Sequence, residues 1–329
     1  MARGQCRRRS ERQHGLKLWI DTDGGVDDAL AIACALAAPD VELVGISAVF
    51  GNVAPRRAAR NAALVQSFFP GPACPVWVGA TRPLVGTWRD ARTVHGPDGL
   101  GGATAQHELP FEEQVVLEAH PEETAHRLAT FAREAGPEGR LVCIGPLTHL
   151  AVALSRHPGA FDRLGGIVCM GGTLSIPRPR RGDAEFNFSS DLEATRGVLA
   201  QAPRLLILPL DTCRRVVLRR ARLARIAKET GSGLTRFLRR AHTHYMDFYL
   251  EREGIDGCYP HDALAVALAV AGDEIFSVAR HDLELDTQQG FPGLLSPSPQ
   301  GRPLQVATGV DLRAALNWIE TCLRGSKAD

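Results

Sequence analysis

The chain has 329 residues, of which 44% are hydrophobic, 6% aromatic and 23% charged, and its formal net charge at pH 7 is +1. This composition is typical of a globular protein with room for one large α/β domain or two smaller ones. It excludes the strongly basic surface expected of a nucleic-acid-binding protein, and no apolar stretch approaches the roughly 20 residues that span a bilayer. We therefore expect neither nucleic acid nor a membrane as a partner.

The N-terminal residues are rich in arginine and are not followed by the apolar region of a secretory signal. We predict a disordered basic tail over residues 1–15, with a short mitochondrial presequence as the alternative. The chain has eight cysteines without a CxxC pair, which favours a reducing compartment over a disulfide framework or a zinc site. The expected location is the cytoplasm.

Short apolar runs alternate along the chain with longer helical patterns. The predicted strands are 17–21, 43–49, 76–79, 141–144, 166–170 and 205–210. The predicted helices are 29–36, 55–69, 121–135, 147–156 and 191–201. This alternation indicates an α/β fold: an open, mostly parallel, Rossmann-like sheet with helices on both faces. We assign residues 16–329 to a single domain, with loops at 176–182 and 290–303 and a helical segment, 230–253, beside the site.

Four carboxylates follow the first predicted strand. Asp21, Asp23, Asp27 and Asp28 lie between a strand-like run and an apolar helix, and ligands of such sheets bind outside the carboxyl ends of the strands. Two unit charges about 4 Å apart repel by roughly 4 kcal/mol at an effective dielectric of 20. Helix capping explains one of these carboxylates but not all of them. The segment therefore predicts a cation site, and ligands that are all oxygens indicate Ca²⁺ or Mg²⁺.

Three further segments carry polar residues next to predicted strands or helices. His261 and Asp262 precede an apolar helix, Glu185 and Asn187 flank an aromatic residue, and residues 145–148 follow a strand with backbone carbonyls that suit Ca²⁺. Taken alone, each segment is explained better by ordinary structure: a capped helix, the start of a helix after a loop, and a βα turn.

Together, these segments resemble the signature of one enzyme family, the inosine-uridine preferring nucleoside hydrolases. The acidic segment matches the DxDxGxDD motif of that family. Further matches follow in the family order, at residues 49–52, 95–101, 145–148, 170–172, 185–187 and 261–262. The resemblance implies the nucleoside hydrolase fold, a tightly bound Ca²⁺, and hydrolysis of the N-glycosidic bond of ribonucleosides to free base and ribose. It also implies a homodimer or homotetramer.

The resemblance implies a catalytic role for some of the matched residues. The Ca²⁺ ligands would be the carboxylates of Asp23, Asp28 and Asp262 and the backbone carbonyl of Thr148. Asp23 would also take a proton from the attacking water. His261 would protonate the leaving base.

Other matched residues would contact the substrate. The residues expected to hold the ribose hydroxyls are Asp27, Asn52, Glu185 and Asn187, with Met170 against the sugar. On the side of the base, His95 would line the pocket. Two tyrosines outside the matched motifs, Tyr245 and Tyr249, lie one helical turn apart and would close over it.

Two positions depart from the family pattern. Pro179 stands where many members have an Asn that contacts ribose, and His149 stands where an Asn usually follows the Thr. We expect His149 to be tolerated because the metal contact of Thr148 uses the backbone. Asp21 is expected to support the acidic turn. Two alternatives stay open: a non-catalytic ribose- or calcium-binding protein, and a glycosidase for a larger ribosyl substrate whose phosphate the arginines at 178–181 would reach.

Overall fold

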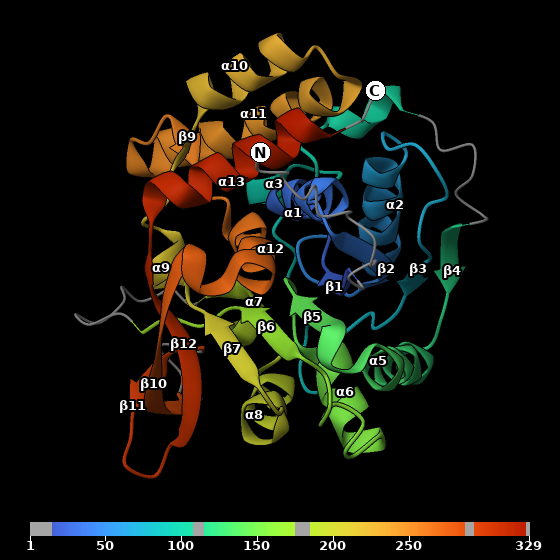
Figure 1. Ribbon diagram of the computed structural model, residues 1–329, viewed down its shortest axis with the longest axis vertical. Helices are drawn as coiled ribbons and strands as arrows, with labels where there is room; N and C mark the ends of the chain where they lie inside the picture. Colours follow the sequence, from blue (N-terminus) through green and yellow to red (C-terminus); the bar gives the residue numbers. More distant parts are fainter. Residues whose placement is uncertain (1–14, 108–114, 175–184, 287–292, 327–329) are drawn as a thin grey trace, which may run out of the picture.

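The computed structural model describes residues 15–107, 115–174, 185–286 and 293–326. At its centre lies a ten-stranded sheet in the order β11-β10-β12-β7-β6-β5-β1-β2-β3-β4 (Figure 1). The strands are β1 (Leu16–Thr22), β2 (Val41–Ala48), β3 (Val76–Val78), β4 (Val116–Glu118), β5 (Gly139–Cys143), β6 (Gly166–Met170), β7 (Leu205–Leu208), β10 (Phe276–Leu285), β11 (Leu295–Pro297) and β12 (Arg302–Val310). Strand β10 runs antiparallel to its two neighbours, and the other neighbouring pairs are parallel. The predicted α/β fold is therefore confirmed.

Helices cover both faces of this sheet (Figure 1). One face carries α1 (Val26–Ala37), α2 (Pro55–Gln66), α12 (His261–Ala271) and α13 (Leu312–Gly325), and the other carries α5 (Pro121–Ala135), α6 (Thr148–Arg156) and α8 (Leu192–Gln201). The two faces have separate apolar cores. In β1, Leu18 and Ile20 enter the first core and Trp19 enters the second, because successive side chains of a strand point to opposite faces.

Further elements complete the described chain. They are α3 (Arg92–His95), α7 (Phe186–Ser190), α9 (Leu210–Cys213), α10 (Arg220–Thr230), α11 (Gly233–Glu253) and the two-stranded sheet β8 (Leu218–Arg219) and β9 (Gly257–Cys258), with 3₁₀ turns at Ala103–Gln106, Gly136–Glu138 and Gly272–Glu274. Within the described ranges, none of the helices combines the length and the apolarity that crossing a membrane requires.

Strand β1 occupies the position in the sheet where the direction of chain growth reverses. From β1 the chain adds β2, β3 and β4 on one side, and it then returns to add β5, β6, β7 and β12 on the other. Ligands of open α/β sheets bind outside the carboxyl ends of the strands at such a switch point. The acidic segment begins at the carboxyl end of β1, so the topology places it there.

The predicted elements are largely confirmed, with shifts of one to three residues at most ends. The strand predicted at 205–210 ends at Leu208 because Pro209 caps the short helix α9. The prediction of a loop over 290–303 is wrong in its described part, since β11 and the start of β12 fall within it. The sequence pattern missed these strands because they form an exposed antiparallel edge with few buried residues. The predicted loop at 176–182 and nearly all of the predicted tail lie outside the described residues.

Candidate active site

One cavity of about 210 Å³ lies above the carboxyl ends of β1, β5 and β6. It is lined by Asp27, Asn52, Ala91, Val94, His95, Ile144, Met170, Glu185, Phe186, Asn187, Leu210, Tyr245, Tyr249, His261 and Asp262. Every substrate-binding residue predicted from the sequence is among them. The remaining predicted site residues, Asp23, Asp28 and Thr148, are buried and do not line the cavity. The sequence analysis did not single out the apolar members Ala91, Val94 and Leu210, which carry no chemical signal of their own.

Three carboxylates converge at this cavity from two helix N-termini. Asp27 and Asp28 lie in the first turn of α1, and Asp262 lies in the first turn of α12. Each offers an oxygen within 4.8 Å of the others, and all three side chains are buried. Burial, followed by the charge of Asp28, raises the pKa of Asp27 to about 8. Burial and the neighbouring aspartates likewise raise the pKa of Asp262. A metal ion held by this cluster would offset the repulsion.

Asp23 lies beside this cluster, where Asn52 binds both of its carboxylate oxygens. The backbone N–H of Asn52 donates to Oδ2 of Asp23 at 2.9 Å, and the Asn52 side-chain amide donates to Oδ1 at 2.7 Å. Burial and the charge of Asp28 raise the pKa of Asp23. A Cβ at residue 51 would overlap the Asp23 carboxyl, so Gly51 lets the loop after β2 approach this closely. Asp23 is outside the group of three converging carboxylates, and its role as a metal ligand stays a prediction.

Asp28 holds the acidic turn in shape. Its Oδ1 accepts hydrogen bonds from the Thr22 hydroxyl at 2.5 Å and from the backbone N–H of Asp23 at 3.2 Å. Its Oδ2 accepts from the backbone N–H of Gly25 at 2.7 Å and from the Asn52 amide at 3.3 Å. Asp28 therefore caps α1, and its role as a cation ligand stays a prediction.

Glu185 and Asn187 enter the cavity from the start of α7. The Glu185 carboxylate caps this helix, accepting from the backbone N–H groups of Asn187 and Phe188 at 2.7 and 2.8 Å, and it also accepts from Gly172 at 2.8 Å. The Asn187 amide donates to the backbone carbonyls of Ile144 and Met170. These bonds fix two polar side chains at the rim of the carboxylate cluster, where a polyhydroxylated ligand would meet them.

Aromatic and imidazole rings form the other side of the cavity. His95 stacks on Tyr245 with ring centroids 4.9 Å apart, and the Tyr245 hydroxyl donates to Oδ2 of Asp27 at 3.3 Å. The Tyr249 hydroxyl lies 3.5 Å from that of Tyr245 and 3.3 Å from Nε2 of His261. Burial lowers the pKa values of His95 and His261 to about 3, so both rings are neutral at pH 7. The predicted base-side residues are thus brought together.

Asp191 is a residue of this region that the sequence analysis missed. Its Oδ2 accepts from the Thr148 hydroxyl at 2.7 Å and from the backbone N–H of Leu84 at 2.9 Å, and its Oδ1 caps α8 through Ala194. The side chain is 1% exposed. Its only signal in the sequence is an Asp before a predicted helix, which is also the signal of an ordinary cap.

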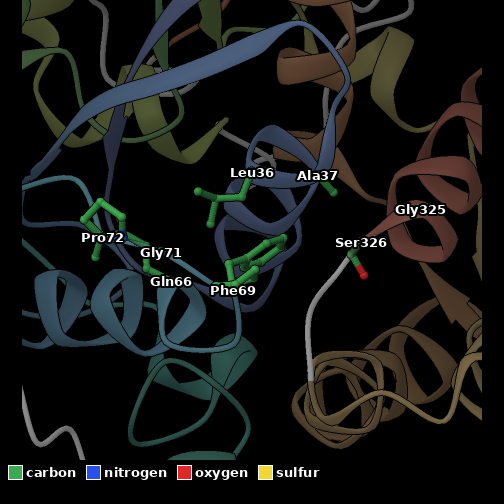
Figure 2. Close-up of a pocket in the computed structure, with 10 residues that line it drawn as sticks. Leu36, Ala37, Gln66, Phe69, Gly71, Pro72, Gly325 and Ser326 are labelled. Atoms are coloured by element: carbon green, nitrogen blue, oxygen red, sulfur yellow. The ribbon is translucent and has the colours of Figure 1, made fainter.

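A second cavity, of about 300 Å³, lies at the opposite end of α1 from the acidic turn (Figure 2). It is formed where α1, α2 and α13 end, and Figure 2 shows Leu36, Gln66, Phe69 and Ser326 at its wall. Among the described residues, no ionisable side chain lines it. It therefore lacks the acids and bases of the first cavity, which is the candidate active site.

Comparison with known proteins identifies the family of this chain. The model of the inosine-uridine preferring nucleoside hydrolase family matches residues 18–317. The chain is 28% identical to a probable uridine nucleosidase 1 of Oryza sativa subsp. japonica, covering 95% of this chain and 98% of that protein. It is 29% identical to the non-specific ribonucleoside hydrolase RihC of Escherichia coli, covering 94% and 98%. The solved structure of a purine-preferring ribonucleoside hydrolase from Gardnerella vaginalis matches with a TM-score of 0.83 and 26% identity, covering 94% and 98%.

The chain therefore belongs to the inosine-uridine preferring nucleoside hydrolases. It is an N-ribosyl hydrolase, an enzyme that hydrolyses ribonucleosides to a free base and ribose. The alternative of a non-catalytic binding protein drawn from the sequence is not supported, and its one motivation, the segment 177–181, lies outside the described residues.

Proposed function

We propose that this hydrolase depends on Ca²⁺ bound by Asp28 and Asp262, two of the converging carboxylates, together with the neighbouring Asp23, and that its reaction takes place in the adjoining cavity. The observation that carries the proposal is the meeting of the buried carboxylates of Asp27, Asp28 and Asp262 beside a cavity that Asp27 and Asp262 line together with Asn52, Glu185 and Asn187. The donors are all oxygens, which suits a hard cation. Oδ1 of Asp27 is buried without a hydrogen-bond partner among the described residues, as expected of an atom kept for a ligand.

The residues proposed to hold the cation are Asp23, Asp28, Asp262 and the backbone carbonyl of Thr148. Bound Ca²⁺ would lower the pKa of a water molecule and keep the surrounding carboxylates ionised. The side chains then divide the remaining work. Asp23, oriented by its two bonds to Asn52, accepts a proton from the attacking water.

The ribose is proposed to bind through Asp27, Asn52, Glu185 and Asn187, with Met170 as an apolar wall. A hydrolysed N-glycosidic bond leaves positive charge on the ribosyl ring in the transition state. The carboxylates below the ring stabilise this charge more than they stabilise the neutral substrate.

The leaving base is proposed to take its proton from His261. This ring is neutral and carries one N–H, and its Nδ1 atom has no hydrogen-bond partner among the described residues. The Tyr249 hydroxyl beside Nε2 can resupply the proton. As Nδ1 gives its proton to the base, Nε2 takes the hydroxyl proton of Tyr249, so the ring stays neutral. The proton that Asp23 took from water returns to Tyr249 through solvent before the next turnover, which closes the balance. His95 and Tyr245 present their rings to the base.

The experiment that tests this proposal measures base release from a panel of purine and pyrimidine ribonucleosides, before and after removal of divalent ions with a chelator. We expect turnover of at least one ribonucleoside, its loss in chelator, and its recovery with Ca²⁺. A chelated enzyme that keeps its full rate would refute the metal dependence. Including nucleotides and ADP-ribose tests the larger-substrate alternative.

We also propose a cytoplasmic homodimer or homotetramer. Support comes from the family resemblance and from cysteines that are free among the described residues, as in reducing compartments. Light scattering on the purified protein and fractionation of cells that express it test the two statements.

A further inference from the structure

Asp21 and His149 meet behind the candidate active site. Both are fully buried, and neither lines the cavity. Nδ1 of His149 lies 2.8 Å from Oδ1 of Asp21. The sequence analysis gave Asp21 only a supporting role and treated His149 as a tolerated departure, so this contact joins two residues that the proposed function leaves unused.

The hydrogen bonds around His149 fix its tautomer. The backbone N–H of Ala80 donates to Nε2 of His149 at 2.6 Å, so Nε2 is an acceptor without a hydrogen. In a neutral imidazole the proton is then on Nδ1, which donates to Asp21. On the other side of Asp21, the Ser47 hydroxyl donates to Oδ1 at 2.5 Å and accepts from the Trp19 indole N–H at 3.0 Å. Donor and acceptor are therefore assigned for every hydrogen bond in this series, from Ala80 through His149, Asp21 and Ser47 to Trp19.

This chain of bonds ties together three loops that carry site residues. Asp21 lies two residues before Asp23 at the end of β1, and His149 directly follows Thr148 at the start of α6. The carbonyl of Ala80 accepts from the backbone N–H of Phe50 at 3.0 Å, and Phe50 lies two residues before Asn52. A shift of the imidazole would thus move the supports of Asp23, Asn52 and Thr148 together.

Gly79 makes room for the imidazole. A Cβ at this position would overlap Nε2 and Cε1 of His149 most severely. It would also come within 2.9 Å of the Thr124 hydroxyl oxygen, which no hydrogen bond among the described residues holds in place. The backbone of Gly79 is not in the left-handed region, so an alanine is acceptable to the chain itself. Space for His149, and not backbone geometry, therefore requires glycine here.

We propose that His149, as the neutral Nδ1–H tautomer seated over Gly79, is a positioning residue. It holds the Thr148 carbonyl at the fixed distance from Asp23 and Asn52 that cation binding needs. The link to cation binding rests on the proposed function, whereas the link between Gly79 and His149 does not.

The test is a double-mutant cycle of Gly79→Ala and His149→Asn in the full-length enzyme. The shorter Asn keeps a donor at the place of Nδ1 for Asp21 and vacates the space that the new Cβ needs. His149→Gln is the converse variant, because it keeps an acceptor for Ala80 and loses the donor to Asp21. Gly325→Ala is the matched control, since its Cβ meets nothing within 4 Å. For each variant we measure the Tm, the Ca²⁺ Kd by calorimetry, kcat and KM.

We expect Gly79→Ala alone to weaken Ca²⁺ binding by about tenfold or more, the range for residues that orient metal ligands, and to lower kcat more than it raises KM. Added to His149→Asn, the same substitution should change the Ca²⁺ Kd less than about twofold. His149→Gln should weaken Ca²⁺ binding more than His149→Asn does. The control should match the wild type.

Two results would overturn the proposal. One is equal loss of Ca²⁺ affinity from Gly79→Ala in both backgrounds; the other is a lower Tm with unchanged Kd and kcat, which would make the contact purely structural. If Gly79→Ala does not fold, the two His149 variants decide the question: the proposal is refuted if His149→Gln does not weaken Ca²⁺ binding more than His149→Asn does. If the wild type binds no Ca²⁺, the proposed Ca²⁺ dependence fails, and that failure leaves the contact between Gly79 and His149 to be tested by itself.

In that case the ¹⁵N resonances of labelled histidine still report the tautomer, and an Nε2–H signal from His149 would refute the assignment.

Discussion

The side-chain amide of Asn52 donates to Oδ1 of Asp23 at 2.7 Å while its backbone N–H donates to Oδ2 at 2.9 Å. One residue of the loop after β2 thereby sets the orientation of a carboxyl group at the end of β1. Rotation of that carboxyl would break a bond inside the protein, where few replacements exist. The proposed general base is consequently held in place before any substrate arrives.

Asp23→Asn is expected to keep the fold and lower kcat by about 10²- to 10⁴-fold, the usual contribution of a general base. The asparagine amide offers one acceptor oxygen where Asn52 supplies two donors, so one buried donor loses its partner and the Tm should fall modestly below that of the wild type. Steady-state kinetics with inosine and uridine, and thermal unfolding, are the measurements. Wild-type turnover by this variant would show that Asp23 is not the base.

The stability of the metal-free enzyme is expected to fall as the pH rises from about 4 to about 8. The pKa of Asp27 is about 8 in the folded chain and about 4 in an unfolded one. The folded state therefore binds more protons than the unfolded state across this window, and it loses stability as the pH increases. We expect the Tm in chelator to drop by about 5 °C or more between these limits, and added Ca²⁺ to remove the slope. A chelated protein with a Tm independent of pH would contradict the carboxylate cluster.

Tyr249→Phe is expected to slow natural substrates more than substrates with a good leaving group. Its hydroxyl contacts Nε2 of His261 at 3.3 Å, so its loss impairs proton delivery to the base. A decrease in kcat of about 10²-fold on ribonucleosides should accompany a small effect on p-nitrophenyl riboside, whose leaving group departs without protonation. Equal losses on both substrates would assign Tyr249 to ribose positioning instead.

Asp191→Ala is expected to destabilise the enzyme by about 2–3 kcal/mol, because it removes a helix cap and leaves two further donors, the Thr148 hydroxyl and the Leu84 N–H, unpaired. It should also weaken Ca²⁺ binding through Thr148. Asp311→Ala is the control: Asp311 caps α13 through Arg313 and Ala314, away from the site. It should cost about 1 kcal/mol with no change in the Ca²⁺ Kd.

The sequence predicted those parts of the fold that depend on short-range patterns. The apolar run of β1 and the helix after it can be predicted from neighbouring residues alone, and the same holds for β5 and α5. Strands β10 to β12 were missed because their outer residues are exposed and their apolar positions do not repeat. The strand order, and with it the switch at β1, is a property of chain topology that no local pattern states.

The candidate site was likewise predicted only in part: its charged residues and motif residues were found, and the long-range contacts that support them were not. Carboxylates at a strand end indicate a cation from charge alone, and the family motifs supplied the partners at 185–187 and 261–262. The bond from Ala80 to His149 spans 69 residues and that from Thr148 to Asp191 spans 43. Both join ordinary residue types in ordinary turns, so only the folded arrangement shows them.

The three converging carboxylates come from distant parts of the described chain, Asp27 and Asp28 from α1 and Asp262 from α12. A ribosome that has released the first two hundred residues has made neither a complete sheet nor a complete ion-binding site. Under the proposed function, capture of the cation would therefore come late in folding, and a nascent or truncated chain lacking α12 would not bind Ca²⁺ even where its first half has folded.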